Sequence, residues 1–350
     1  MKFDVDYFEN TLCDVLAIDS PTGFTHDAIE RVKEIVDDMG YNSFVTNKGN
    51  LAVDIKGKNV DKCVGISAHI DTLGLVVRSI KTDGKLTFTK VGGSILPTLD
   101  GEYCKVYTRC GKTYTGTILS NSPASHVFDN ANDLARDLKN MHIRLDVAHN
   151  GEYAKKEQVE ELGIMPGDFI CIDPKTEILE NGFIKSRFLD DKAGVAIVLT
   201  MLKHFKDEDI VPTNNVSVIF SAYEEVGHGL AYLPNSEKIS EFVAIDMGCI
   251  GDDLQGSEFK VSICAKDSSG PYDYELTTRL INLAKGANLN FAVDIYPFYG
   301  SDVSAAQASS NDFKGALMGP GIAASHGMER THIDSCKNAW ELLYLYLTKG

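Results

Sequence analysis

The residue pattern of this 350-residue chain changes twice along its length. In residues 1–71 and again in 176–350, apolar runs of strand length alternate with amphipathic runs of helix length. That alternation is typical of a mostly parallel sheet with helices on both faces. In residues 72–175 short alternating runs are separated by turn pairs such as Asp83–Gly84, which predict hairpins, and two later stretches, 132–140 and 152–162, have helical patterns. We therefore predict an α/β domain with a small β-rich, barrel-like domain inserted.

Charge and composition exclude several classes of partner. The chain has 34 Lys and Arg against 50 Asp and Glu, a formal net charge of −16, whereas nucleic acids and anionic membranes attract basic surfaces. Its longest apolar runs, such as 193–202, are too short to cross a bilayer, and its acidic N-terminus is unlike a signal peptide. The eight cysteines include no Cys-x-x-Cys pair, which fits reduced thiols. We expect a cytoplasmic protein without nucleic-acid or membrane partners.

Imidazole and carboxylate groups stand at the ends of apolar, strand-like runs. His69, Glu224 and Asp246 each end or follow such a run, and Asp190 directly precedes a long helical pattern. Ligands of open α/β sheets gather at the carboxyl ends of strands, so these side chains could converge at one edge. Mixed imidazole and carboxylate ligands suit zinc, cobalt or manganese better than calcium, which binds oxygen. The pattern predicts a centre for two divalent ions.

The motif His69-x-Asp71 places both side chains on one face of a strand. Asp71 could then orient the imidazole while His69 binds metal, although a histidine that only ends a strand would give the same motif. The pair Asp190–Asp191 has an equally plain alternative, because aspartate is a good helix N-cap. We expect one of the two to cap the helix and the other to bridge two ions.

The pair Glu224–Glu225 follows an apolar strand, and adjacent side chains of an extended chain point apart. One could bind metal while the other acts as general base, although an exposed acidic loop is the alternative. Asp246 has its own alternative as a turn residue at a strand end. Two histidines, His326 and His332, compete as the last ligand, and spacing alone does not choose between them.

Together these motifs resemble the dinuclear metalloaminopeptidases of the glutamyl aminopeptidase and tetrahedral (TET) aminopeptidase family. Each motif is weak alone, but their order and spacing are specific and extend over nearly the whole chain. The motifs that carry the resemblance are Asn47–Asn50, Ala68–Asp71, Val91–Gly93, Leu162–Asp168, Leu189–Gly194, Glu224–Gly227, Asp246 and Gly300–Asp302. The chain departs from the family pattern at Thr72, where an acid is usual, and at 324–327, where the family usually has Tyr-Ile-His-Ser.

The resemblance implies a role for each matching residue. Asp190 would bridge the two metals, His69 and Asp246 would complete one site, and Glu225 with a C-terminal histidine would complete the other. The distance to the closing helix favours His326 for that place. Glu224 would be the general base, Asp71 would support His69, and Asp302 would lie near the substrate's amino end or the metal shell. The resemblance also implies a zinc-peptidase-like α/β fold. In the family the inserted domain mediates oligomerisation, so dimers that assemble to a dodecamer are expected.

We therefore expect a metal-dependent aminopeptidase that removes N-terminal residues from peptides through a metal-activated water and a glutamate base. An amidohydrolase or deacylase on the same dimetal scaffold is the nearest alternative, because the chemistry at the metals would be shared. An endoglucanase-like glycoside hydrolase would leave both histidines without a role. A non-catalytic assembly protein would not need a full set of ligands. The sequence does not distinguish the preferred N-terminal residue or the native metal.

Overall fold

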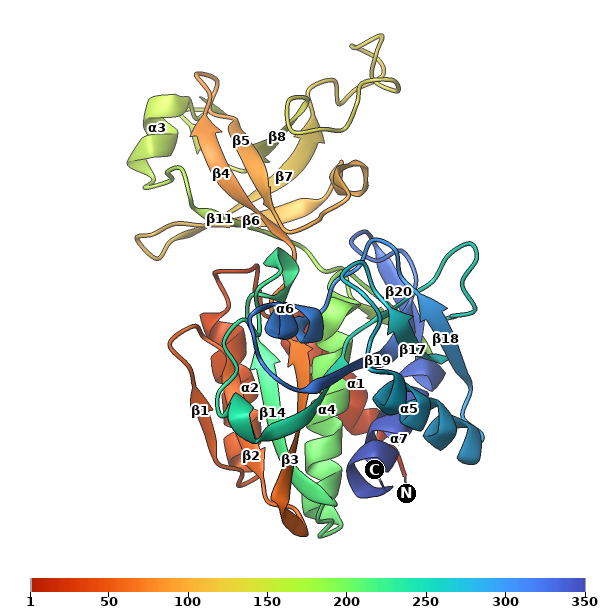
Figure 1. Ribbon diagram of the computed structural model, residues 1–350. Coiled ribbons are helices and arrows are strands. Elements are labelled where there is room, and N and C mark those ends of the chain that lie inside the picture. Colours follow the sequence, from red (N-terminus) through yellow and green to blue (C-terminus); the bar gives the residue numbers. More distant parts are fainter. Residues whose placement is uncertain (1, 350) are drawn as a thin grey trace. The chain divides into compact units, whose positions relative to one another are not determined.

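The structure, a computed structural model, describes residues 2–349 and divides into two compact units (Figure 1). The large unit comprises Met1–Thr72 and Lys175–Gly350, and the small unit comprises Leu73–Pro174. Within residues 2–349, no helix combines the length and the hydropathy that crossing a bilayer requires.

A nine-stranded mixed sheet forms the centre of the large unit. Its strands are, in spatial order, β1 (Ser43–Val45), β2 (Leu51–Ile55), β14 (Asn214–Ser221), β3 (Asn59–His69), β15 (Ile239–Ile245), β19 (Lys314–Ile322), β17 (Val261–Lys266) and β18 (Phe291–Ile295), with β16 (Gly248–Cys249) beside β19. The central strands β14, β3, β15 and β19 are all parallel, whereas β1, β2 and β17 add antiparallel pairs. The prediction of a mostly parallel sheet is therefore confirmed.

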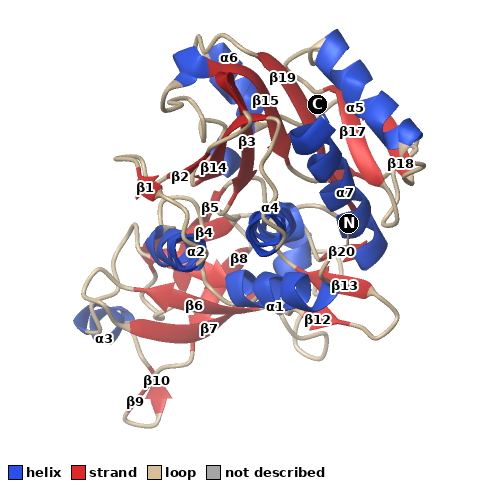
Figure 2. Cartoon of the chain, turned by 90° about the horizontal axis from the view of Figure 1, so that it is seen from below, coloured by secondary structure: helices blue, strands red, loops and turns tan. Residues whose placement is uncertain are grey.

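Helices cover both faces of this sheet (Figure 2). One face carries α1 (Val5–Leu16), α2 (His26–Asp38), α4 (Leu189–Asp207), α5 (Tyr274–Gly286) and α7 (Ile333–Lys349). The opposite face carries the short helix α6 (Asp302–Ala308), which the sequence pattern did not reveal. A separate three-stranded sheet is formed by β12 (Glu177–Ile178), β13 (Phe183–Ser186) and β20 (Glu329–His332).

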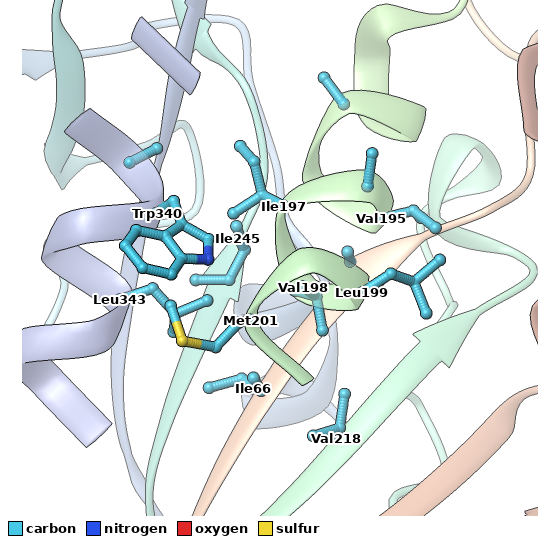
Figure 3. Packing of buried hydrophobic residues seen from close by; sticks show 14 of the residues in the cluster. Ile66, Val195, Ile197, Val198, Leu199, Met201, Val218, Ile245, Trp340 and Leu343 are labelled. Carbon is cyan, nitrogen blue, oxygen red and sulfur yellow. The ribbon is translucent and has the colours of Figure 1, made fainter. Parts of the chain in front are cut away.

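Helix α4 is the central element of the larger core. Every residue from Leu189 to Leu202 is buried, and Trp340 of α7 packs with this helix, fully shielded from solvent (Figure 3). Close packing also requires a residue without a side chain at Gly194, where a Cβ would lie 2.4 Å from the carbonyl oxygen of Ile245. Real Cβ contacts of that length do not occur, so glycine is required where α4 crosses β15. This packing holds the first turn of α4 against the strand ends that bear the acidic residues.

The small unit is a closed antiparallel barrel, as the hairpin pattern predicted. Its strands are, in barrel order, β11 (Phe169–Ile172), β4 (Gly74–Ile80), β5 (Leu86–Val91), β8 (Met141–Leu145), β7 (Thr113–Ser120) and β6 (Tyr103–Tyr107). A hairpin of β9 (Ala148–His149) and β10 (Glu152–Tyr153), the helix α3 (Lys156–Glu161) and a 3₁₀ turn, η1 (Leu96–Leu99), complete it.

The helix predicted at 152–162 is present over a shorter range as α3, whereas the helix predicted at 132–140 is wrong, because those residues form turns. The guanidinium of Arg136 lies inside this segment and donates to the carboxylate of Asp100 and to the carbonyl oxygens of Leu134 and Ala131. These bonds occupy carbonyl groups that a helix would use for itself. A long-range partner thus overrides a local helical preference.

Candidate metal centre

Three strand ends and one helix start bring a first group of ligands together. β3 ends at His69, and the parallel pairing with β15 brings Asp246, the residue after β15 ends, to the same edge of the sheet. Asp190 approaches from the first turn of α4, where its peptide bond to Asp191 is cis. The Nε2 atom of His69 lies 3.0 Å from Oδ1 of Asp190 and 4.0 Å from Oδ1 of Asp246.

A second group shares Asp190 with the first. The Nε2 atom of His326 lies 3.5 Å from Oδ2 of Asp190 and 3.6 Å from Oε2 of Glu225. The two oxygens of Asp190 therefore face two different imidazoles. In each group, ligand atoms from three side chains lie within 4.8 Å of one another. One carboxylate between two such groups is the arrangement that bridging of two ions requires.

The donor atoms of both groups fit divalent cations. Each group combines one imidazole with two carboxylates, and metal bonds of about 2.0–2.2 Å to such ligands leave ligand atoms separated by roughly the distances found here. Glu225 has a second carboxylate oxygen, Oε1, that is buried without a hydrogen-bond partner among the described residues. The groups are thus consistent with divalent metal binding.

The tautomer of His69 also suits a metal ligand. Its Nδ1 lies 2.9 Å from the main-chain carbonyl oxygen of Asp71, an acceptor only, so Nδ1 carries the proton and donates. The lone pair of Nε2 then points toward Asp190 and Asp246. Orientation of a ligating imidazole by a carbonyl oxygen is a common arrangement in metal sites.

The electrostatics of the cluster favour a cation. Burial, followed by the charge of Asp190, raises the pKa of Asp246 to about 7 and that of Glu329 to about 8. Burial also raises the pKa of Glu224 and of Glu225 well above the ordinary range, and neighbouring carboxylates add to both shifts. So many ionised carboxylates repel one another in a region of low dielectric, and positive charge between them would relieve that repulsion.

Glu224 and Glu225 lie in a short 3₁₀ turn, η2 (Glu224–Val226), and not on extended chain. Their side chains nevertheless diverge. Oε2 of Glu224 lies 3.7 Å from Nε2 of His69, whereas Oε2 of Glu225 lies beside His326 in the second group. Because Glu224 is in neither ligand group and only 14% of its side chain is exposed, its carboxylate is available beside the centre.

Asp71 contacts the turn of the two glutamates as well as His69. Its carboxylate accepts hydrogen bonds from the main-chain nitrogens of Glu224 and Glu225, at 3.1 and 3.3 Å, and from the hydroxyl of Thr22 at 2.6 Å. The distance from Oδ1 of Asp71 to Nδ1 of His69 is longer, at 3.6 Å. The sequence motif indicated a carboxylate that orients the imidazole. In the structure the carbonyl group of Asp71 orients the imidazole, while its carboxylate holds the turn of the two glutamates.

The structure separates the two competing histidines. His332 lies in neither ligand group: its Nδ1 accepts from the main-chain nitrogen of Asp334, and its Nε2 donates to the carbonyl oxygen of Asn181. Its ring packs against Phe183 and Phe259. Both ring nitrogens are thus used in structural contacts, and His326 is the histidine beside Asp190 and Glu225.

Glu329 was missed by the sequence reasoning. Its two carboxylate oxygens accept from the main-chain nitrogens of Asp190, at 3.0 Å, and His326, at 2.9 Å. This buried side chain therefore fixes two candidate ligands that are far apart in sequence. Its position three residues after His326 is a weak signal, and only the fold shows that the two residues act together.

Comparison with known proteins places these observations in a family. Residues 49–342 match the family model of the M42 glutamyl aminopeptidases. The chain is 41% identical over 334 residues, 95% of both chains, to YhfE of Bacillus subtilis (strain 168), whose assignment as an aminopeptidase is provisional. It is also 24% identical to the glutamyl aminopeptidase of Lactococcus lactis subsp. cremoris over 213 residues. That matched stretch covers 60% of this chain and 58% of that protein.

A solved structure extends the likeness to the fold. The TET1 peptidase of Pyrococcus horikoshii, which can assemble into a tetrahedron or a large octahedral shell, superposes with a TM-score of 0.84 at 23% identity, covering 98% of this chain and 100% of that one. The resemblance drawn from the sequence is confirmed, and the chain belongs to the M42 glutamyl aminopeptidase family.

Proposed function

We propose that this peptidase is a metal-dependent aminopeptidase that holds two divalent ions and removes N-terminal residues from peptides. The observation that carries the proposal is Asp190, whose two oxygens face His69 in one ligand group and His326 in the other. Glu224 lies beside this pair of groups without belonging to either. Zinc, cobalt and manganese all suit this donor set.

When bound, such ions polarise the scissile carbonyl group and lower the pKa of an attacking water. The protein's own residues do the rest. The carboxylate of Glu224, which belongs to neither ligand group and lies 3.7 Å from Nε2 of His69, would accept a proton from the water and pass it to the leaving amine. Asp71 fixes the main chain of Glu224, and Glu329 fixes that of Asp190.

The carboxylates that belong to neither ligand group favour an exopeptidase that acts at the amino end, since bound ions would neutralise the ligands themselves. A peptide's N-terminal ammonium is attracted to a cluster of acidic groups, whereas its C-terminal carboxylate is repelled. Asp302, also buried near the centre, adds to this negative potential, and charges of Asp302 and Asp71 act on Lys48 nearby. An aminopeptidase is therefore preferred over a carboxypeptidase or an endopeptidase.

We also propose that the protein assembles into a homo-oligomer through the barrel of residues 73–174. The support is likeness in fold to the Pyrococcus horikoshii peptidase, which forms closed shells. Dimers that build a dodecamer are the expected arrangement. Sedimentation velocity of the full chain tests it, and a monomer at micromolar concentration would contradict it.

The test of function is hydrolysis of a panel of aminoacyl-p-nitroanilides, free and N-acylated peptides, N-acyl amino acids and soluble cellulose. The protein is first stripped with a chelator and then supplied with zinc, cobalt or manganese. Release of N-terminal residues from free peptides, restored by metal, is expected. Release of acyl groups alone would replace the proposal with a deacylase, and activity that ignores chelation would exclude the two-metal mechanism.

A further inference from the structure

Two sequence motifs contain no member of either ligand group, Asn47–Asn50 and Gly300–Asp302. They come from opposite ends of the chain, yet both contact one short segment of the large unit. That segment is residues 222–230, called here the acidic loop because it carries Glu224 and Glu225. Both motifs therefore contact the segment that carries Glu224 and Glu225.

Asn50 joins the two ends of the acidic loop. Its side chain is fully buried, Oδ1 accepts from the main-chain nitrogen of Ala222 at 3.1 Å, and Nδ2 donates to the carbonyl oxygen of Gly229 at 3.0 Å. A single amide therefore bonds to the main chain on both sides of Glu224 and Glu225. Loss of either bond would leave a buried polar group unpaired, which is costly.

Lys48 and Asp302 hold the second half of the loop. The ammonium of Lys48 donates to the carbonyl oxygens of His228 and Gly229, the latter at 3.2 Å. Oδ1 of Asp302 accepts from the main-chain nitrogen of Leu230 at 3.0 Å, and Oδ2 accepts from the hydroxyl of Ser221, the residue before the loop.

The loop is packed so closely that one position excludes a side chain. A Cβ on Gly229 would lie 2.2 Å from Oδ1 of Asp302 and 3.0 Å from the main-chain nitrogen of Glu224. These contacts fix the loop at both ends, and the bonds from the nitrogens of Glu224 and Glu225 to the carboxylate of Asp71 fix it at its middle.

We propose that Asn50, Lys48 and Asp302 are positioning residues that set the place of Glu224 and Glu225, an inference that rests on the proposed function of those two glutamates. The physical reason is distance. A general base must reach within about 2.6–3.2 Å of the proton that it takes, and a misplacement of about 1 Å commonly costs roughly 10²-fold in rate. A loop without regular secondary structure on either side of η2 reaches that accuracy only through side chains such as these.

The test compares Asn50→Ala with a matched control, Asn215→Ala. Asn215 makes the same pair of bonds, accepting from the nitrogen of Gly57 at 2.9 Å and donating to the carbonyl oxygen of Val60 at 3.0 Å, but at the end of β14 remote from the acidic loop. Both variants lose one donor and one acceptor to the main chain. Only the first should loosen the loop.

Two readouts are taken on the full-length, metal-supplied protein. Hydrogen exchange followed by mass spectrometry should show faster exchange of residues 222–230 in Asn50→Ala and none of this change in Asn215→Ala. Steady-state kinetics should show kcat lowered roughly 10–100-fold in Asn50→Ala with KM changed little, as is usual when a residue that orients the centre is removed. If Asn50→Ala does not fold, Lys48→Met, at a half-buried position, takes its place with the same expectations.

Unchanged exchange in the loop would overturn the proposal, and so would a loosened loop with kcat equal to that of Asn215→Ala. A wild-type protein that hydrolyses nothing with any metal would instead refute the proposed function. In that case the exchange comparison would still decide whether these side chains fix the loop.

Discussion

Removal of divalent metal should destabilise the protein, and more strongly as the pH rises. Burial and neighbouring charge raise the pKa of Asp246 from 3.8 to about 7 and that of Glu329 from 4.5 to about 8. A carboxyl group whose pKa is higher in the folded state stabilises the fold below its unfolded pKa and loses that contribution as the pH rises through its folded pKa. The metal-free protein should therefore lose stability between about pH 4 and pH 8.

Bound ions act in the opposite direction, because they compete with protons for the same carboxylates. At 100 times its dissociation constant, each ion stabilises the folded state by about 2.7 kcal/mol, so two ions contribute about 5 kcal/mol. The large unit, Met1–Thr72 with Lys175–Gly350, has about 250 residues, for which 1 kcal/mol corresponds to a change of roughly 2–4 °C in Tm. Metal should therefore raise Tm by about 10–20 °C.

The assay is differential scanning calorimetry of chelator-treated protein, with and without zinc or manganese, at pH 5.5 and pH 7.5. The shift in Tm should be larger at pH 7.5. Asp246→Asn serves as the control, because it removes a ligand of the first group and leaves Glu225 and His326 of the second, so that about half of the shift should remain. A Tm that is the same with and without metal at pH 7.5, or a shift that does not depend on pH, would refute the reasoning.

Three further predictions concern single residues. Glu224→Gln should retain both ions in a metal-binding titration but lose roughly 10²–10⁴-fold in kcat, since the base is removed; activity near wild type would exclude this role. His326→Ala should lower the affinity for the second ion and leave the Tm of the metal-free protein nearly unchanged. His332→Ala should lower the Tm of the metal-free protein while metal affinity stays, because its ring and both nitrogens make only structural contacts; the reverse pattern would contradict the assignment. The barrel contains His142, whose pKa is lowered to about 4 by burial and by the charge of Lys85. The stability that its neutral form contributes above about pH 6.5 should therefore be lost as the pH falls toward 4. Urea unfolding at pH 7 and pH 5 should show a smaller loss for His142→Gln, and an equal loss would show that this histidine is not responsible.

Much of the fold was readable from periodicity. Long buried elements such as α4 and β14 have apolar patterns that neighbouring structure reinforces, and the barrel hairpins are marked by turns such as Asp83–Gly84. The secondary-structure predictions failed where contacts with residues distant in sequence determine the local structure. Residues 132–140 have a helical pattern, but Arg136 bonds there with Asp100 and with main-chain carbonyl groups instead. Helix α6 is short and has too few turns to show a period.

His69, Asp246 and Asp190 were predicted because they lie at or just after the end of a strand or at the start of a helix, where the residue types are visible in sequence. Glu225 lies in the turn after β14 and His326 in the turn between β19 and β20. The roles of Glu329 and Asn50 were not predicted, since both side chains bond to main-chain groups that are remote along the chain. Such bonds leave no local pattern. Spacing alone did not choose between His326 and His332, which only the resemblance favoured in the order His326 over His332, because the choice depends on which groups lie beside each imidazole.

The sequence by itself therefore determined the class of fold and the inserted barrel, and it predicted the candidate metal ligands, because periodicity and residue chemistry are local properties. Only the tertiary structure decided how these side chains are shared. It turned the two oxygens of Asp190 toward different histidines and directed the carboxylate of Asp71 to the turn of Glu224 and Glu225. These outcomes depend on distances between residues more than a hundred positions apart, which packing sets and which no spacing along the chain encodes.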